Sequence, residues 1–400
     1  MSVRRLRLLY ASYGIAMGFL TPWNVPQMLG EGLTPEVIGL VLGVAALASM
    51  LAYPVWGILA DTVLGRERTL LLSGVLGAFV GLGLLAAGSQ PALLALVVIL
   101  ASVVIAPIAP VTDALSLGTV GQDARAYGRI RLLGSAGWVV GVLTAGPLYA
   151  IGGPAPVRAL YVVMSLSICL AVGLGRTVAR PERARRAPEE RISVTSLRAA
   201  MRFSPVFLPF LGVLLLVTVA TSASWSFVTL RILDEGGGPV LIGVASAMPA
   251  IAEIPLFASV GRLTDRFGLR ALFSIGCLIT ASQMLVVAVA PNAAIVAVVR
   301  LLDGAGFALR YTATVIIAGR GLPERLRATG QSMTWLVMNG IAPVVSGPVG
   351  GVIYGSFGGT VLFTLCSTLI TAGAGLAWMV LRPLGLARPT PAPAPAPTEP

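Results

Sequence analysis

Two similar polar segments recur in this chain: Gly57-Ile-Leu-Ala-Asp61-Thr-Val-Leu-Gly65-Arg66-Glu-Arg68 and Gly261-Arg-Leu-Thr-Asp265-Arg-Phe-Gly268-Leu-Arg270. The first glycine and the aspartate of one copy each lie 204 residues before their counterparts in the other. The first copy has one extra residue before its second glycine. Matching glycine and charged positions at one long period indicate an internal structural repeat. The sequence therefore predicts two similar halves.

The composition places both halves in a membrane. The chain has 400 residues, of which 56% are hydrophobic and 11% charged, and its mean hydropathy is +0.90. Soluble domains carry about 25% charged residues. Apolar runs such as Ala92–Ile108, Pro205–Ala220 and Val361–Leu381 approach or exceed the ~18–20 residues that cross a hydrocarbon core. We expect helices, because the roughly ten-residue alternating segments of a membrane barrel do not occur.

Apolar runs between polar breaks predict about twelve transmembrane helices. They lie near 8–29, 36–60, 68–88, 91–118, 128–151, 157–176, 204–231, 240–262, 269–290, 292–319, 326–354 and 357–382. Arginines gather at both termini and at alternate connections, and the opposite loops are predicted to hold only Arg158 and Arg231. The positive-inside rule makes the arginine-rich face cytoplasmic, in a bacterial inner (plasma) membrane with both termini cytoplasmic. The net charge of +12 then reflects the arginines that set the orientation of the helices in the membrane, and no nucleic-acid partner is expected.

The polar stretches divide the chain. We predict an N-terminal six-helix bundle over residues 1–178, a cytoplasmic linker over 179–203 and a C-terminal six-helix bundle over 204–384. Residues 385–400 alternate proline with small residues, which is typical of a disordered tail.

Missing residue types exclude several functions. The chain has no histidine and no lysine, and no nucleotide-binding loop of the lysine-containing type. Its three cysteines lie inside apolar runs without metal-ligand spacing. We therefore expect a protein that is not an enzyme and that has no cofactor and no metal. We also expect a monomer, whose partners are the lipid bilayer and a small-molecule substrate.

The two polar segments resemble the loop signature of the major facilitator superfamily, and with the helix count this resemblance covers essentially the whole chain. It implies a cytoplasmic gate in which each aspartate pairs with an arginine and with neighbouring helix ends to hold the cytoplasmic side closed. The implied gate residues are Gly57, Asp61, Arg66, Gly261, Asp265, Arg266, Gly268 and Arg270.

A narrower resemblance concerns the fourth and fifth helices. Ala109-Pro-Val-Thr-Asp113-Ala and Tyr127-Gly-Arg129-Ile-Arg131-Leu-Leu-Gly134-Ser-Ala-Gly137-Trp138 look like the corresponding stretch of the lactose and phenylpropionate permease branch. The resemblance implies that Asp113 and Arg131 clamp a polar group of the substrate and that Trp138 stacks on it. The other interpretation is that Arg131 only marks a helix end and that Trp138 is an ordinary packing residue. Trp23 and Asn24, at the end of the first helix, are further substrate-binding candidates.

Charged residues inside the predicted helices are the other functional signal. A charge at mid-bilayer costs at least ~2.5–3.5 kcal/mol and is normally kept for function. Glu253 lies in the eighth helix, and Arg300, Asp303 and Arg310 share one face of the tenth. Glu253, among apolar neighbours, is the first candidate for binding a coupling proton. Asp303 is either a second candidate or a permanently ionised partner of Arg300 or Arg310.

Together these patterns predict a secondary active transporter that moves a small polar or amphipathic solute of the sugar, nucleoside or aromatic acid type. Proton-coupled symport is the first interpretation. Glycines near Gly146-Pro147 leave a proton-coupled efflux antiporter for drugs or sugars as the alternative, and a channel or receptor is the alternative of a different class.

Overall fold

The structure is a computed structural model that describes residues 1–382 except 89, 121–123, 174–205, 321 and 323–325. The described residues form helices and no strand. The elements are α1 (Val3–Leu20), η1 (Thr21–Trp23), α2 (Asn24–Gly30), α3 (Pro35–Ile58), η2 (Leu59–Val63), α4 (Arg66–Ala86), α5 (Pro91–Ile105), α6 (Ile108–Val120), α7 (Ala124–Gly152), α8 (Pro154–Gly173), α10 (Phe207–Asp234), α11 (Pro239–Val289), α12 (Ala293–Arg320), α13 (Arg327–Leu336), η4 (Val337–Ile341) and α14 (Ala342–Val380). The predicted linker 179–203 and tail 385–400 lie outside the described residues.

The described helices provide about twelve membrane spans. Nine stretches have the length and apolar composition of a membrane span. Three more crossings are α1 with η1 and α2, the charge-bearing α12, and the last part of α14, which Gly358 separates from the stretch before it. The predicted all-α membrane fold with about twelve helices is confirmed.

Glycines at the sharp turns repeat between the two halves. Gly32 and Gly236, 204 residues apart, have φ of 84° and 74° and precede the helices that begin at Pro35 and Pro239. A positive φ is a conformation that glycine adopts without a steric penalty, and proline is favoured in the first turn of a helix. The same local chemistry therefore forms the same turn in both halves.

A π-helical turn absorbs the extra residue of the first polar segment. The N–H of Leu64 donates to the carbonyl of Leu59 at 2.8 Å, which is an i to i+5 bond inside η2. The turn glycines Gly65 and Gly268 consequently reach the same backbone conformation, with φ of 81° and 77°. The two copies are structurally equivalent despite their different lengths.

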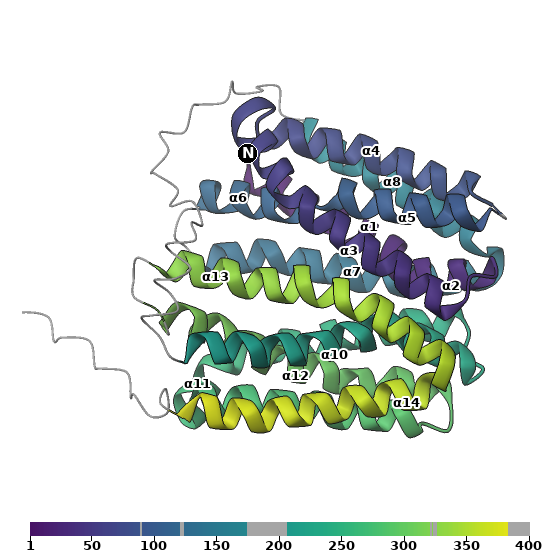
Figure 1. The fold of residues 1–400 in the computed structure, drawn as a ribbon. Helices are drawn as coiled ribbons and strands as arrows, with labels where there is room; N and C mark the ends of the chain where they lie inside the picture. The colour runs from purple at the N-terminus through teal and green to yellow at the C-terminus, as the bar shows by residue number, and fades with distance from the viewer. Residues whose placement is uncertain (89, 121–123, 174–205, 321, 323–325, 383–400) are drawn as a thin grey trace, which may run out of the picture.

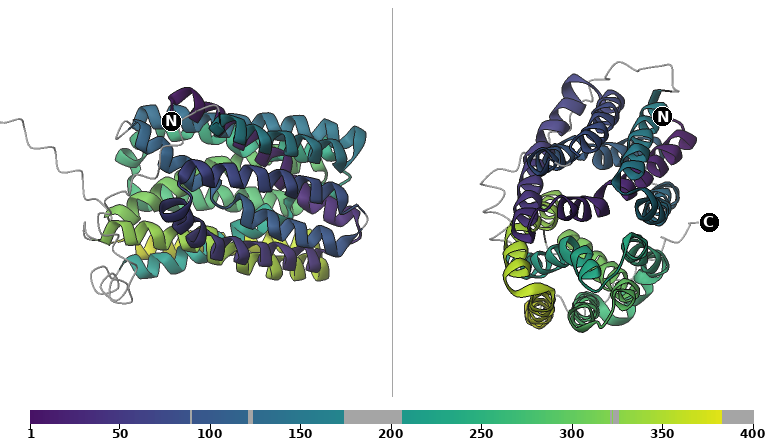
Figure 2. Two further views of the ribbon diagram at one scale, coloured as in Figure 1. Left: turned by 90° about the horizontal axis from the view of Figure 1, so that it is seen from above. Right: turned by 90° about the vertical axis from the view of Figure 1, so that its right-hand side faces the viewer.

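The two halves lie side by side with their helices nearly parallel (Figure 1). The view along the helices separates the purple-to-blue N-terminal group from the green-to-yellow C-terminal group (right panel of Figure 2). We call the end that carries the N-terminus and the turns at Gly65 and Gly268 the arginine-rich end, and the other the distal end. The halves meet where α3 packs on α14 and α7 packs on α11.

Glycines bring the halves into backbone contact toward the distal end. A Cβ on Gly39 of α3 would lie 2.3 Å from the carbonyl oxygen of Gly347 in α14. A Cβ on Gly243 of α11 would lie 2.6 Å from the carbonyl oxygen of Val142 in α7. Gly39 and Gly243 are again 204 residues apart, so the repeat supplies both contacts. These two helix pairs close the distal end.

Two arginines predicted in distal loops lie in helices instead. Arg158 belongs to α8 and is fully buried, and Arg231 belongs to the last turn of α10. Arg231 pairs with Glu235 at 2.8 Å and donates to the carbonyls of Val287 and Ala288. Neighbouring polar groups accept hydrogen bonds from both guanidinium groups inside the bundle. A hydropathy plot of the sequence does not reveal these neighbours.

Candidate functional site

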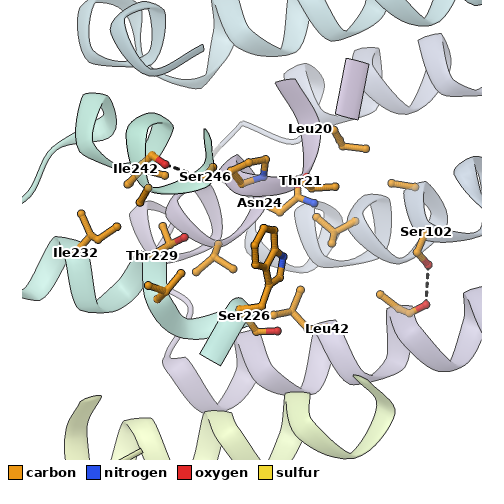
Figure 3. Close-up of a pocket in the computed structure, with 18 of the residues that line it drawn as sticks. Leu20, Thr21, Asn24, Leu42, Ser102, Ser226, Thr229, Ile232, Ile242 and Ser246 are labelled. Carbon is orange, nitrogen blue, oxygen red and sulfur yellow. Dashed lines mark hydrogen bonds between the residues drawn. The ribbon is translucent and has the colours of Figure 1, made fainter. Parts of the chain in front are cut away.

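A central cavity of about 220 Å³ lies between the two halves (Figure 3). Eight helical elements contribute to its wall. Its lining residues include Leu20, Thr21, Asn24, Leu42, Ala45, Ser102, Trp225, Ser226, Thr229, Ile242, Ser246 and Arg300. Arg300 is the only charged residue among the described residues that line it. The wall is otherwise apolar, with hydroxyl and amide groups at a few points, which is typical of a small-molecule site.

Trp225, Trp138 and Arg300 connect the halves at this cavity. The ring of Trp225 in α10 lies 6.4 Å from that of Trp138 in α7, and the Trp138 indole N–H donates to the carbonyl of Ser246 in α11 at 3.0 Å. The Arg300 guanidinium stacks over Trp225, with 4.7 Å from its carbon to the ring centroid. Trp225 remains 46% exposed, so part of its ring is free for a bound solute.

Asp303 is paired with Arg300, one of its two candidate partners. Nη1 of Arg300 lies 2.9 Å from Oδ2 of Asp303, and Arg300 is 2% exposed. Arg310 instead donates to the Thr280 hydroxyl of α11 at 3.5 Å. Of the four charges predicted to take part in proton coupling, Arg310 therefore stands apart.

Glu253 lies near the Arg300–Asp303 pair. The backbone of α11 abuts α12 where a Cβ on Gly304 would lie 2.1 Å from the carbonyl oxygen of Pro249. Glu253 follows Pro249 by one helical turn, and it interacts electrostatically with both Asp303 and Arg300. Its side chain makes no hydrogen bond or ion pair with the described residues. The structure thus brings three of the four predicted charges together, on two helices of the same half.

Asp113 and Arg131 also meet. Their closest charged atoms are 3.8 Å apart, the Tyr10 hydroxyl donates to Asp113, and Arg131 donates to the Tyr127 hydroxyl at 3.0 Å. Arg131 is 56% exposed and interacts with Tyr311 of the opposite half. Arg131 and Trp138 are seven residues apart on one face of α7, so this cluster lies about two turns from the aromatic group, toward the arginine-rich end.

Trp23 and Asn24 have different surroundings. Trp23 is fully buried, stacks on Tyr149 at 5.1 Å and donates to the carbonyl of Gly18, so it packs the bundle and does not line the cavity. Asn24 does line the cavity. Its amide oxygen accepts a 2.9 Å hydrogen bond from Arg158.

Arg158 is a buried charge without a carboxylate contact among the described residues. Besides Asn24, its guanidinium donates to the Gln27 side chain at 2.9 Å and to the carbonyls of Phe19 and Leu20. The helix break at η1 supplies those carbonyls. Four neutral groups of this kind can hold an arginine inside a bundle, because charge-assisted hydrogen bonds are strong where water is absent.

The predicted gate residues lie at the arginine-rich end and belong to separate halves. Asp61 pairs with Arg66 of its own segment at 3.5 Å, with both side chains about half exposed. Asp265 is exposed and has no partner among the described residues. Arg266 lies against its neighbour Phe267, and Arg270 lies over Trp378, 3.8 Å from the ring centroid. Gly57 and Gly261 lie within α3 and α11. Among the described residues, no ion pair, hydrogen bond or ring contact joins a gate residue of one half to a gate residue of the other.

Sequence reasoning missed Trp225 and the role of Arg158. Trp225 is the one large side chain in the run Thr221-Ser-Ala-Ser-Trp225-Ser, and an isolated aromatic among small residues could have been singled out. Arg158 is close to the end of an apolar run, a position that by sequence alone indicates a loop.

A twelve-span bundle of two repeated halves around a central cavity, closed at one end, defines the class of polytopic solute transporters. The chain belongs to the MFS_1 like family, which matches residues 3–365, and thus to the major facilitator superfamily. It is a multi-pass membrane transport protein and not an enzyme.

Individual relatives transport different solutes. The chain is 29% identical over 349 residues to the maltose permease of Geobacillus stearothermophilus, which covers 86% of each chain. It is 28% identical over 279 residues to a probable 3-phenylpropionic acid transporter of Escherichia coli (strain K12), which covers 69% of this chain and 72% of that protein. The solved structure of the nucleoside transporter NupG aligns with 96% of this chain and all of that one, with a TM-score of 0.82 and 15% identity. That likeness shows the fold.

Proposed function

We propose that this protein is a proton-coupled symporter that carries a small organic solute across a bacterial inner membrane by alternating access. The observation that carries the proposal is the position of Glu253. This carboxyl group interacts with Arg300, which lines the cavity, and with its partner Asp303. A change in the protonation of Glu253 therefore changes the charge next to the solute.

The conformation supports one stage of that cycle. The distal end is closed by the contacts of Gly39 and Gly243, whereas Arg131 at the other side of the cavity is 56% exposed. With the arginine-rich end in the cytoplasm, as the positive-inside rule requires, this is the inward-facing state. Rocking of the two halves around the cavity would then open the distal end.

The site suggests a role for each group of residues. Asp113 and Arg131 form a polar clamp on the route from the cavity to the cytoplasm. Trp138 and Trp225 provide an aromatic platform. Glu253 binds the proton, and Asp303 stays ionised as the partner of Arg300. Maltose, 3-phenylpropionic acid and nucleosides are the solutes that the names of the similar proteins supply as first candidates.

Efflux is the competing function. Its sequence support was the glycine series in the fifth helix, but Gly137 and Gly141 pack against α1 and Gly146 packs against Val240 of α11. Helix packing accounts for these glycines, so they do not favour an antiporter.

Proteoliposomes test the proposal. Purified protein is reconstituted in phosphatidylethanolamine and phosphatidylglycerol with a pH-sensitive dye inside, and maltose, 3-phenylpropionate or uridine is added outside. Symport moves protons inward with the solute, so the lumen should acidify, whatever the orientation of the protein. Antiport would make the lumen alkaline. Solute flux without proton movement, or without accumulation under an imposed proton gradient, would overturn the proposal.

A further inference from the structure

Some hydrogen-bonding groups of the central cavity are already paired within the protein, and others are free for a solute. The hydroxyls of Thr21, Ser102 and Ser246 donate to the helix carbonyls of Met17, Ala45 and Ile242 at 2.8–3.0 Å. Figure 3 shows the hydrogen bonds that the hydroxyls of Ser102 and Ser246 make to helix carbonyls. The donor capacity of these hydroxyls is therefore already used within the protein.

The strong acceptors near the cavity are also occupied. The Asn24 amide oxygen accepts from Arg158, which leaves the amide N–H₂ of Asn24 as its remaining polar group. Asp303, the carboxylate that pairs with Arg300, is not part of the wall. A cationic solute needs a carboxylate, and the described residues of the wall provide none. The hydroxyl oxygens of the wall can still accept hydrogen bonds, so the wall excludes a cation and leaves the choice between a neutral and an anionic solute to Arg300.

Arg300 has unused donor capacity. Its Nη1 serves Asp303, but its Nε is fully buried and has no hydrogen-bond partner. An unpaired buried N–H of a charged group is costly, and an anionic oxygen is its best partner. The guanidinium group of Arg300 also stacks on the ring of Trp225. The exposed part of that ring is an apolar surface next to the positive charge of Arg300.

We infer that the solute is a small monocarboxylate with a flat apolar body, which binds Arg300 with its carboxylate and lies with its ring or chain against Trp225. This inference rests on the proposed function, because it assigns the solute of the same cavity. The volume of about 220 Å³ is below the roughly 300–1,000 Å³ of drug-sized sites, which suits a single ring and not a disaccharide.

Equilibrium binding to the detergent-purified protein tests this without any proton gradient. Phenylacetate and phenylacetamide have the same shape and differ in charge, so their dissociation constants isolate the carboxylate contact. We expect phenylacetate to bind at least tenfold more tightly than phenylacetamide. Equal binding, or tighter binding of the amide, would overturn the inference.

Two variants assign the contacts. Removing Arg300 alone strands Asp303, so the double variant Arg300→Met with Asp303→Leu replaces the whole pair by apolar residues of similar size. It should lose the preference for phenylacetate over the amide, and a preserved preference would contradict the role of Arg300. Trp225→Leu should weaken both compounds at least fivefold, whereas Trp335→Leu, an exposed residue outside the cavity wall, should change neither.

The binding and transport results separate the two proposals. Proton-coupled accumulation of maltose or uridine, with no binding of phenylacetate, would refute the monocarboxylate and leave the symporter standing. Selective binding of phenylacetate, with solute flux that moves no protons, would refute the symporter and leave the carboxylate site standing.

Discussion

Gly39 and Gly347 lie back to back, one in each half of the protein. A Cβ on Gly39 would lie 2.3 Å from the Gly347 carbonyl oxygen, and a Cβ on Gly347 would lie 2.6 Å from that of Gly39. Real Cβ atoms do not approach a carbonyl oxygen this closely, so the distal end closes only because both positions lack a side chain.

Gly39→Ala is therefore expected to shift the protein toward the distal-open state. Ser246→Cys, in a background with the three native cysteines replaced by alanine, serves as the reporter on the cavity wall. A membrane-impermeant thiol reagent applied from the distal side should label it several-fold faster in Gly39→Ala than in the parent. Gly375→Ala, in α14 and outside the gate, is the control, because a Cβ there meets no atom within 4 Å. Equal labelling in the two glycine variants would count against this closure.

Glu253→Gln should separate exchange from accumulation. Glutamine imitates the protonated carboxyl group, so the variant should still bind solute and exchange it across a vesicle membrane. Uptake driven by a proton gradient should be lost, because the group can no longer gain and release a proton. Normal active uptake would transfer the coupling role to Asp303 or Asp113, or to another ion.

Asp303→Asn should destabilise the protein instead. It leaves Arg300 buried without its ionic partner, and breaking a buried pair costs about 3–5 kcal/mol. Asp61→Asn breaks the half-exposed pair with Arg66 and should cost at most ~1 kcal/mol. Thermal unfolding in detergent compares the two variants. If Asp303→Asn unfolds at the temperature of Asp61→Asn, Asp303 is not the structural partner of Arg300.

Arg131→Lys should impair solute transport nearly as much as Arg131→Ala. In the proposed clamp, the planar guanidinium of Arg131 would bind a polar group of the solute with two parallel N–H donors while Nη1 stays near Asp113 and the Tyr127 hydroxyl, and lysine has no such planar group. The exposed neighbour Arg129 supplies the control, since Arg129→Lys keeps the topological charge. Initial rates of counterflow in proteoliposomes measure the effect. Near-parental rates for Arg131→Lys would show that Arg131 contributes only its positive charge at the cytoplasmic end of the helix.

Asp61→Asn and Asp265→Asn test the gate in the other conformation. Both aspartates are exposed here, so their gating contacts belong to the state in which the arginine-rich end is closed. Losing them should favour the present state and raise labelling of the Ser246→Cys reporter from the arginine-rich side. Unchanged labelling in both variants would contradict a latch at these positions.

Much of the fold could be predicted from local patterns. The spans follow from hydropathy, and the two halves follow from the matching segments at Gly57 and Gly261. The turns follow from glycine and proline, because the backbone preference of these residues is local. The site was only partly predictable: Asp113 with Arg131 came from a motif, while Trp225 has no motif and its contact with Arg300 joins positions 75 residues apart.

The sequence by itself determined that this protein is a repeated bundle of membrane helices with charges buried in the middle, since hydrophobic length, charge placement and period are properties of the chain. Only the tertiary structure decided which charges pair. Asp303 lies on the same helical face as Arg300 and Arg310, and the chain alone could not choose between them. The choice depends on Thr280 of the neighbouring helix, which accepts from Arg310, and on Trp225, which covers Arg300. Helical periodicity gives the direction of a side chain, but its partner depends on how the helices pack.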